Sequence, residues 1–390
     1  MMEAEKKVPK KSQGLIQGRV SQVSIEGFRN LAKIENLELP QMALLIGANG
    51  AGKSNFIRFF EMLGWMLKGQ NFQEFVQRQG GADNLLYMGA KVTQHIRATI
   101  RMATHKGWND YRFALTHLPA DDSLIFVEEA YRYSDKSRSG EAPWNALSSG
   151  TREGQLPLAI KDAPTPKGKT TARTVTHLLR QCVTYQFHDT SPTANIKRAW
   201  DVTENARLRS DGANLAPVLL NLFENDPRAY SRIVQRIQRV LPIFLDFVLE
   251  PNFGKVLLRW RSKQGDKTFG PDSTSDGSLR LFCLVTLLSL PGEMLPDVLF
   301  LDEPELGLHP FAIQLVAAMM RSLSATRQII ASTQSVTLVN EFSWENLIVA
   351  DQIDGKAHFR RLDEQGVVSW LELYQIGEMW EKNILGGTPE

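Results

Sequence analysis

The chain has 390 residues, of which 43% are hydrophobic and 23% are charged, and its 45 basic and 43 acidic side chains leave a net charge of +2. This balance predicts a globular protein with a substantial core, built as two or three units or as one large α/β domain with insertions. It excludes a uniformly basic nucleic-acid coat and a strongly acidic protein, while local basic patches are compatible with it.

The first half of the chain begins with a polar segment, residues 1–18, which we expect to form a disordered tail. Apolar residues on both sides of Gly27 predict two strands around a turn, and the apolar run 43–46 predicts a strand buried on both faces. A glycine-rich loop follows, and then a helix over 53–68. Alternating apolar residues make 80–135 rich in predicted strands.

The second half begins with a change of composition. Ser, Gly, Pro, Lys and Thr dominate residues 134–172, which predicts a loop or a poorly ordered insertion. Beyond it the apolar pattern predicts helices at 215–223, 227–241, 278–290 and 310–324, and strands at 245–250, 255–262, 298–301 and 328–331.

The cysteines and the apolar runs indicate the compartment. Cys182 and Cys283 lie far apart and no CxxC pair occurs, so we expect neither a disulfide framework nor a zinc ribbon. The longest apolar stretch near Cys283 is too short to cross a bilayer, and the N-terminal segment lacks the apolar centre of a signal peptide. We therefore expect a cytoplasmic protein without a membrane partner.

The glycine-rich loop at 47–54 reads GANGAGKS and fits the pattern G-x-x-x-x-G-K-[ST]. It follows a buried strand and opens a helix, as the pattern requires. The glycines let backbone N–H groups converge on phosphates, and the helix N-terminus adds a favourable dipole. Lys53 is expected to hold the β- and γ-phosphates and Ser54 to ligate Mg²⁺. The full predicted ATP-binding set in this loop is Gly47, Ala48, Asn49, Gly50, Ala51, Gly52, Lys53, Ser54 and Asn55.

A second motif is an apolar strand, 298–301, that ends in two carboxylates. Open α/β sheets place ligands at the carboxyl ends of their strands. Asp302 is therefore expected to orient Mg²⁺, and Glu303 to polarise the attacking water as a general base. The long gap between this strand and Lys53 favours an ABC-type ATPase over a small P-loop kinase.

A third motif, Ser-Asp-Gly-Ser-Leu-Arg at 275–280, precedes a predicted helix. Ser and Gly at a helix N-terminus form an anion-binding site, although an ordinary capped turn has the same composition. Its position shortly before the carboxylate strand favours a role in nucleotide binding.

These three motifs together, with Asp-Glu-Pro-Glu-Leu-Gly-Leu-His-Pro at 302–310, resemble the RecF/SMC-like branch of ABC ATPases, and within it the short, armless predicted ATPases of bacteria. The likeness extends over 20–389, apart from much of 134–172. Further matching segments are Gly-Phe-Arg-Asn at 27–30, Phe-His-Asp-Thr-Ser-Pro at 187–192, Asp-Gly-Ala-Asn-Leu-Ala at 211–216 and Leu-Gly-Gly-Thr-Pro at 385–389.

The resemblance implies an α/β fold: an ABC-type P-loop ATPase head with a mixed central sheet, an N-terminal antiparallel β subdomain and a helical lobe. It implies a homodimer, or a higher homo-oligomer, that closes around two ATP molecules. Ser275 and Gly277 of one subunit would then contact the γ-phosphate bound by the other. On this basis the chain divides into a tail (1–18), the N-terminal part of the head (19–133), a loop-rich insertion (134–172), the helical lobe with the C-terminal part of the head (173–365), and a C-terminal helix and tail (366–390).

One position departs from the family pattern. Where the family usually has Thr-His-Ser, this chain has Thr333-Gln334-Ser335. The histidine normally touches the γ-phosphate, and Gln334 can donate a hydrogen bond there but cannot become cationic. The substitution predicts ATP binding with slow turnover. Gln186 is a candidate for the family's Q-loop glutamine, and a hydrogen-bonded core residue is the alternative.

Four arginines recur at steps of four, four and three residues, which places them along one helix face: Arg228, Arg232, Arg236 and Arg239. Such a face is either simply solvated, or a surface for DNA phosphates or an acidic partner.

The expected function is an ATP-hydrolysing switch in DNA repair or phage defence, with a separate effector such as a nuclease or toxin. The alternative is a slow or non-hydrolysing ATP-gated scaffold that restrains a partner protein, and a transporter subunit is disfavoured by the motifs.

Overall fold

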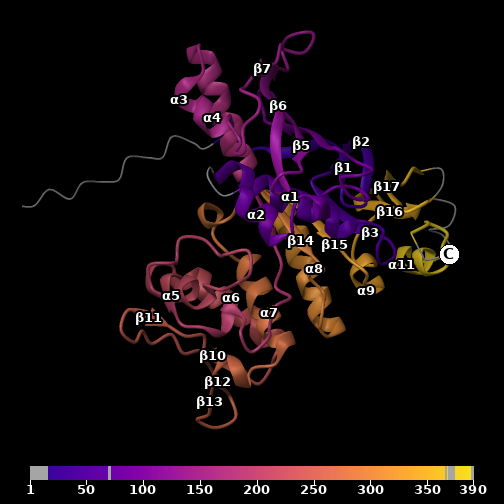
Figure 1. Ribbon diagram of the computed structural model, residues 1–390. Coiled ribbons are helices and arrows are strands. Elements are labelled where there is room, and N and C mark those ends of the chain that lie inside the picture. The colour runs from indigo at the N-terminus through magenta and orange to yellow at the C-terminus, as the bar shows by residue number, and fades with distance from the viewer. Residues whose placement is uncertain (1–15, 69–71, 365–366, 368–373, 388–390) are drawn as a thin grey trace, which may run out of the picture.

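The computed structural model describes residues 16–68, 72–364, 367 and 374–387. The predicted disordered tail lies mostly outside these residues, and the first strand begins at Arg19, as expected. Figure 1 shows a central body of sheets and helices, with a second lobe formed by the middle of the chain beneath it.

The central sheet has six strands in the order β17-β16-β3-β15-β14-β8. Their bounds are β3 Met42–Ile46, β8 Cys182–Tyr185, β14 Val298–Asp302, β15 Gln328–Ser332, β16 Leu347–Ile353 and β17 Lys356–Arg361. All pairs are parallel except β16 with β17. Every residue of β3, β14 and β15 is buried, because helices and the second sheet cover both faces.

The second sheet is antiparallel, in the order β2-β1-β4-β5-β6-β7. Its strands are β1 Arg19–Phe28, β2 Leu31–Glu38, β4 His95–Ala103, β5 Gly107–Leu118, β6 Ser123–Asp135 and β7 Asn145–Ala146. Helix α1 (Lys53–Lys68) joins the two sheets through its aromatic face. Phe59 packs edge-on against Phe28 of β1, and Phe60 stacks on Phe300 of β14 with ring centroids 4.0 Å apart.

The prediction of a loop over 134–172 is wrong from Leu156 onward, where the structure has helices. Helix α3 spans Leu156–Asp162 and helix α4 spans Pro166–Arg180, and they pack on each other beside β6 (Figure 1). The Pro, Lys, Thr and Gly content hid a helical spacing, because Ala172, Val175 and Leu179 fall on one buried face. Thr165 caps α4 by accepting a hydrogen bond from the N–H of Gly168. The region 136–144 is loop, as predicted.

The helical lobe contains α5 (Leu215–Asn225), α6 (Pro227–Val240) and α7 (Asp276–Leu287). Short strands complete it: β10 Phe244–Phe247, β12 Trp260–Ser262 and β13 Thr268–Phe269 in one sheet, and β9 Trp200–Asp201 with β11 Lys255–Val256 in another. Rings of Phe244, Phe247, Trp260 and Phe282 pack together and tie α7 to this sheet. The strand predicted at 245–250 is present as the shorter β10, whereas the single strand predicted at 255–262 is wrong, because β11 and β12 lie at its two ends and belong to different sheets.

The remaining described helices are α2 (Phe72–Arg78), α8 (Pro310–Ser324), α9 (Val336–Val339) and α11 (Ile376–Glu381). Single 3₁₀ turns lie at Asp83–Leu85, Asn195–Lys197, Pro271–Ser273, Gly292–Met294 and Trp344–Asn346. No helix within the described ranges is long and apolar enough to cross a membrane. The predicted fold class, a mixed central sheet with an antiparallel β subdomain and a helical lobe, is confirmed.

Candidate nucleotide site

The loop 47–54 joins the buried strand β3 to α1, at the carboxyl edge of the central sheet. Glycine is required at its start: Gly47 has φ 149°, and a Cβ there would lie 2.1 Å from the carbonyl oxygen of Ala350. Gly52 has φ 102°, and a Cβ there would lie 2.7 Å from the Cβ of Ala357. The loop is thus pressed closely against β16 and β17, and its backbone path is set by these contacts.

Lys53 is the first residue of α1, and its side chain folds back over the loop. Its Nζ donates to the carbonyl oxygens of Gly47 (2.5 Å) and Ala48 (2.9 Å). Burial lowers the pKa of Lys53, and the nearby carboxylates of Glu303 and Asp302 oppose this lowering. The ammonium group is therefore held inside the loop, where the phosphates of a nucleotide would lie in a protein of this loop type.

Asp302 ends β14 and receives three side-chain hydrogen bonds. Ser54 Oγ and Ser332 Oγ donate to its Oδ1 at 3.0 Å and 2.5 Å, and Gln186 Nε2 donates to Oδ2 at 3.2 Å. Hydroxyl and carboxylate oxygens are the ligands that Mg²⁺ prefers. The pair Ser54 and Asp302 therefore fits a magnesium ion, and among the residues that the structure describes no group of three or more His, Cys, Asp or Glu side chains could hold another metal.

Gln186 follows β8, the edge strand next to β14. Besides Asp302, its Nε2 lies 3.2 Å from Nδ1 of His188, whose Nε2 lies 2.9 Å from the backbone oxygen of Asp302. The structure thus brings this candidate Q-loop glutamine to the predicted magnesium ligand. The sequence alone left its assignment open, because no local pattern relates β8 to β14.

Glu303, the predicted general base, adopts φ 43°, a left-handed conformation that is strained for a non-glycine residue. Its N–H donates to both the backbone oxygen (3.2 Å) and Oγ (3.1 Å) of Ser332. The side-chain amide of Gln334 donates a hydrogen bond to Oε1 of Glu303. Gln334 is therefore hydrogen-bonded to Glu303, the predicted general base.

Glu305 was not predicted as a site residue, yet it organises the loop after β15. Its Oε1 accepts hydrogen bonds from Thr333 Oγ1 (2.6 Å) and from the N–H of Gln334 (3.0 Å). Its Oε2 is buried without a hydrogen-bond partner in the described structure. Burial is the main cause that raises the pKa of Glu305. The sequence feature that could have identified Glu305 is its place as the second Glu of the Asp-Glu-Pro-Glu motif.

Asn55, which we predicted to bind nucleotide, is connected to the glycine-rich loop through Asn30. Its Nδ2 donates to Asn30 Oδ1 (2.8 Å), and Asn30 Nδ2 donates in turn to the carbonyl oxygen of Gly50 (2.7 Å). Asn30 ends the Gly-Phe-Arg-Asn segment, and it holds the tip of the glycine-rich loop. The sequence identified the Gly-Phe-Arg-Asn segment as a match to the family pattern but assigned no role to Asn30.

The turn predicted to complete a second subunit's site is at the N-terminus of α7. Ser275 caps this helix, accepting from the N–H of Ser278 at 3.2 Å, and its side chain is exposed. Gly277 packs against the turn after Asp302-Glu303, since a Cβ there would lie 2.6 Å from the oxygen of Gly307. In the described part of the chain no hydrogen bond joins Ser275 or Gly277 to the loop 47–54.

The arginine face of α6 is only partly free. Arg228, Arg232 and Arg239 are exposed, whereas Arg236 is half-buried and its Nη1 donates to Ser289 Oγ at 2.7 Å. Burial, followed by the charges of Arg232 and Arg239, lowers the pKa of Arg236. Three of the four guanidinium groups, rather than four, are therefore available to a partner.

Residues 42–340 match the family described as "AAA domain, putative AbiEii toxin, Type IV TA system". The chain belongs to this family. The match includes the glycine-rich loop, the turn at 275–280 and the carboxylate strand, so the chain is an ATP-binding protein of the AAA/ABC ATPase class. No curated protein sequence matches it.

Solved structures support the same fold. An Smc head bound to the C-terminal winged-helix domain of ScpA is similar with a TM-score of 0.56 and 12% identity, over 90% of this chain and 99% of that one. An Smc head with an extended coiled coil, bound to the C-terminal domain of ScpA and derived from Pyrococcus furiosus, is similar with a TM-score of 0.56 and 14% identity, over 91% and 99%. The resemblance of this AAA-domain protein to the RecF/SMC-like branch is confirmed.

Proposed function

We propose that this protein hydrolyses ATP between two copies of itself and works as an ATP-driven switch. One observation carries the proposal. Lys53, Asp302, Glu303 and Gln334 gather at one edge of the central sheet, whereas the Ser275 turn is exposed on another lobe and bonded to none of them. A helix N-terminus of this kind binds anions. A second subunit is the natural source of the phosphate that it would bind.

In the proposed reaction each residue has a defined task. The N–H groups of the loop 47–54 and Lys53 hold the phosphates, and Ser54 with Asp302 holds Mg²⁺, which when bound would offset phosphate charge. Glu303 accepts a proton from the attacking water, and the Gln334 amide keeps that carboxylate oriented. The strained backbone of Glu303 suits this role, since such conformations cluster at active sites.

The output of the switch is proposed to be an effector on a separate chain, in phage defence or DNA repair. The family description names a putative toxin of a type IV toxin–antitoxin system, and the similar Smc heads are bound to domains of ScpA. Both support a partner protein for this chain. The exposed Arg228, Arg232 and Arg239 support an anionic ligand such as DNA.

A second candidate is an ATP-gated scaffold with very slow hydrolysis. The contact between Gln334 and Glu303 favours it, because a neutral amide cannot supply the positive charge that a histidine could place at the γ-phosphate. Measured turnover with and without duplex DNA separates the candidates: stimulation by DNA supports the switch, and a negligible rate in both conditions supports the scaffold.

The decisive test of the proposal is the Glu303→Gln variant. Without a general base, ATP should persist at the interface and a closed dimer should accumulate, measured by light scattering at saturating ATP and Mg²⁺. Adding Ser275→Asp should abolish this dimer by placing a negative charge beside the phosphate. Ser231→Asp, the same change at an exposed position of α6, is the matched control. A Glu303→Gln protein that stays monomeric contradicts the proposal.

A further inference from the structure

The last described residues of the chain lie against the first residue of the nucleotide loop. After α11 the chain passes through Leu385–Gly387, where Gly387 lies beside Gly47 and Val349 of β16. A Cβ on Gly387 would lie 3.1 Å from the Cα of Gly47 and 3.1 Å from Cγ1 of Val349. A methyl group at Gly387 would therefore press on the loop backbone, and the C-terminal turn, defined here as residues 385–387, packs beside Gly47.

Two side chains of β16 and β17 fasten the C-terminal turn. Asp351 Oδ1 accepts a hydrogen bond from the N–H of Gly387 at 2.6 Å. Arg360 Nη2 donates to the carbonyl oxygen of Leu385 at 2.5 Å, and Arg360 also pairs with Asp351 at 3.6 Å. The side chain of Leu385 is 2% exposed and belongs to the core. The turn is therefore anchored by its backbone as well as by an apolar side chain.

Gly47 is confined from two directions as a result. The carbonyl oxygen of Ala350 meets it on one side, and the Gly387 backbone meets it on another. The carbonyl oxygen of Gly47 is also an acceptor for Lys53 Nζ, at 2.5 Å. Any displacement of Gly47 therefore moves the residue that holds the phosphate-binding ammonium group. The segment that confines Gly47 on this side is more than three hundred residues away in sequence.

Trp380 of α11 supplies an independent sign that this junction is closely packed. Its side chain is 7% exposed, and its Nε1 has no hydrogen-bond partner among the described residues. A Cβ on Gly387 would lie 3.4 Å from that nitrogen. The indole therefore borders the C-terminal turn and can report on it by fluorescence.

We propose that the C-terminal turn is a positioning element for ATP binding, which fixes Gly47 and, through it, Lys53. The proposal rests on the ATP binding proposed above. Because the turn touches no phosphate-binding atom itself, its loss should weaken ATP binding while leaving the chemistry of bound ATP unchanged.

The principal test is Gly387→Ala, with Gly355→Ala as the matched control. Both glycines have left-handed φ values, 81° and 73°, but a Cβ on Gly355 meets nothing within 4 Å. The two variants therefore share the conformational cost, and only the first presses on Gly47. We expect Gly387→Ala to raise the Kd and the KM for ATP about ten-fold, with kcat at saturating ATP retained. Gly355→Ala should match the wild type.

A second pair of variants, at Asp351, tests the same contact even if the Gly387→Ala protein does not fold. Asp351→Ala removes the acceptor for the Gly387 N–H without adding an atom near Gly47, and it should raise the Kd in the same direction. Asp351→Asn retains an acceptor oxygen and should restore binding. The fluorescence of Trp380 is obtained by subtracting the signal of the matching protein that carries Trp380→Phe. It should differ from wild type in Asp351→Ala and return toward the wild-type value in Asp351→Asn.

The outcomes are distinct. If wild type and Gly355→Ala bind ATP but Gly387→Ala and Asp351→Ala bind it equally well, the C-terminal turn has no positioning role and the proposed function stands. If wild type and the control fail to bind ATP, the proposed function itself is wrong, and the inference fails with it. Weak binding in Gly387→Ala and Asp351→Ala, with recovery in Asp351→Asn, supports the inference.

Discussion

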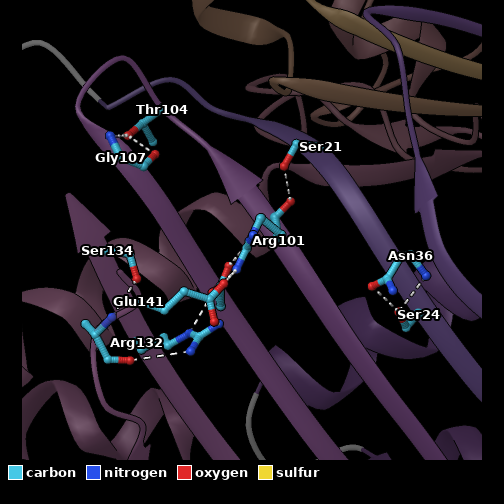
Figure 2. Close-up of polar contacts among 11 residues, drawn as sticks. Ser21, Ser24, Asn36, Arg101, Thr104, Gly107, Arg132, Ser134 and Glu141 are labelled. Atoms are coloured by element: carbon cyan, nitrogen blue, oxygen red, sulfur yellow. Dashed lines mark hydrogen bonds and ion pairs between the residues drawn. The ribbon is translucent and has the colours of Figure 1, made fainter. Parts of the chain in front are cut away.

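Two groups of charged side chains differ in their balance of charge. On the antiparallel sheet, Asp110 is fully buried and accepts hydrogen bonds from Arg101 (2.8 and 3.0 Å) and Arg132 (2.7 Å). Glu141, from the loop after β6, binds both arginines, and Figure 2 shows the three labelled side chains together on the sheet. The ring of Trp144 covers Arg132 at 4.2 Å. Two acids thus meet two cations.

At the carboxyl edge of the central sheet the balance is different. Asp302, Glu303 and Glu305 lie close together, and Lys53 is the cation whose charge interacts with all three. Uncompensated carboxylates in a partly buried site are unfavourable unless a cation arrives. The balanced group, around Asp110, ties three strands and a loop together. The unbalanced group, around Asp302, is organised to receive a divalent ion and a polyphosphate.

The largest expected effect is on the balanced group. Asp110→Asn should leave two guanidinium groups without their shared carboxylate and lower the free energy of unfolding by about 3 kcal/mol. Asp302→Asn, the matched isosteric change, should cost much less, since Asp302 accepts from neutral hydroxyl and amide groups. Chemical denaturation measures both. Equal losses would show that the two groups do not differ as argued.

Lys53→Ala should have the next largest effect, on ligand binding. It removes the cation of the loop, so Mg²⁺·ATP affinity should fall about 100-fold or more, which corresponds to about 2.7 kcal/mol. A thermal-shift titration detects this, because wild type saturated with ATP should be stabilised and the variant should not. Lys33→Ala, on the exposed face of β2, is the control. Unchanged ATP affinity in Lys53→Ala would remove the site assignment.

A smaller effect is expected from adding positive charge beside the unbalanced group. Gln334→His should raise ATP turnover about ten-fold, because a charge-assisted hydrogen bond can form at the transferring phosphoryl group. Gln334→Ala serves as the comparison, since it also frees Glu303 from the amide but adds no charge. Steady-state phosphate release measures the rates. Equal acceleration in both variants would assign the effect to release of Glu303 alone.

The smallest effect concerns Glu305 and pH. Burial raises the pKa of Glu305 above its value in the unfolded chain, so the folded protein binds this proton more tightly. Its stabilising contribution is fully present below the unfolded pKa and is lost as pH rises through the folded pKa. Glu305→Gln stays neutral, so its stability should exceed that of wild type above the folded pKa, and the difference should shrink in acid.

The measurement for Glu305 is urea denaturation at pH 5 and pH 8, with Glu224→Gln at an exposed position of α5 as the control. A stability difference that does not change with pH would mean that the carboxylate is compensated in the folded protein. That result would also weaken the contrast between the two charge groups.

Local patterns were sufficient wherever neighbouring residues carry the information. The loop 47–54 predicted its own strand–loop–helix context, and the run 298–301 predicted an apolar strand, every residue of which is buried. Composition failed at α4, because Pro, Lys and Thr are typical of loops while the apolar spacing beneath them is helical. Gln186 could not be assigned, since its hydrogen bond to Asp302 spans 116 positions of sequence.

The sequence by itself determined the fold class, the phosphate-binding loop and the two carboxylates at the end of β14, because each depends on the periodicity and chemistry of adjacent residues. Only the tertiary structure decided that Gln334 bonds to Glu303, that Oε2 of the buried Glu305 has no hydrogen-bond partner among the described residues, and that Gly387 lies against Gly47. These contacts join separate strand ends and the chain terminus across the sheet edge. Their geometry is set by strand order and packing, which no local pattern encodes.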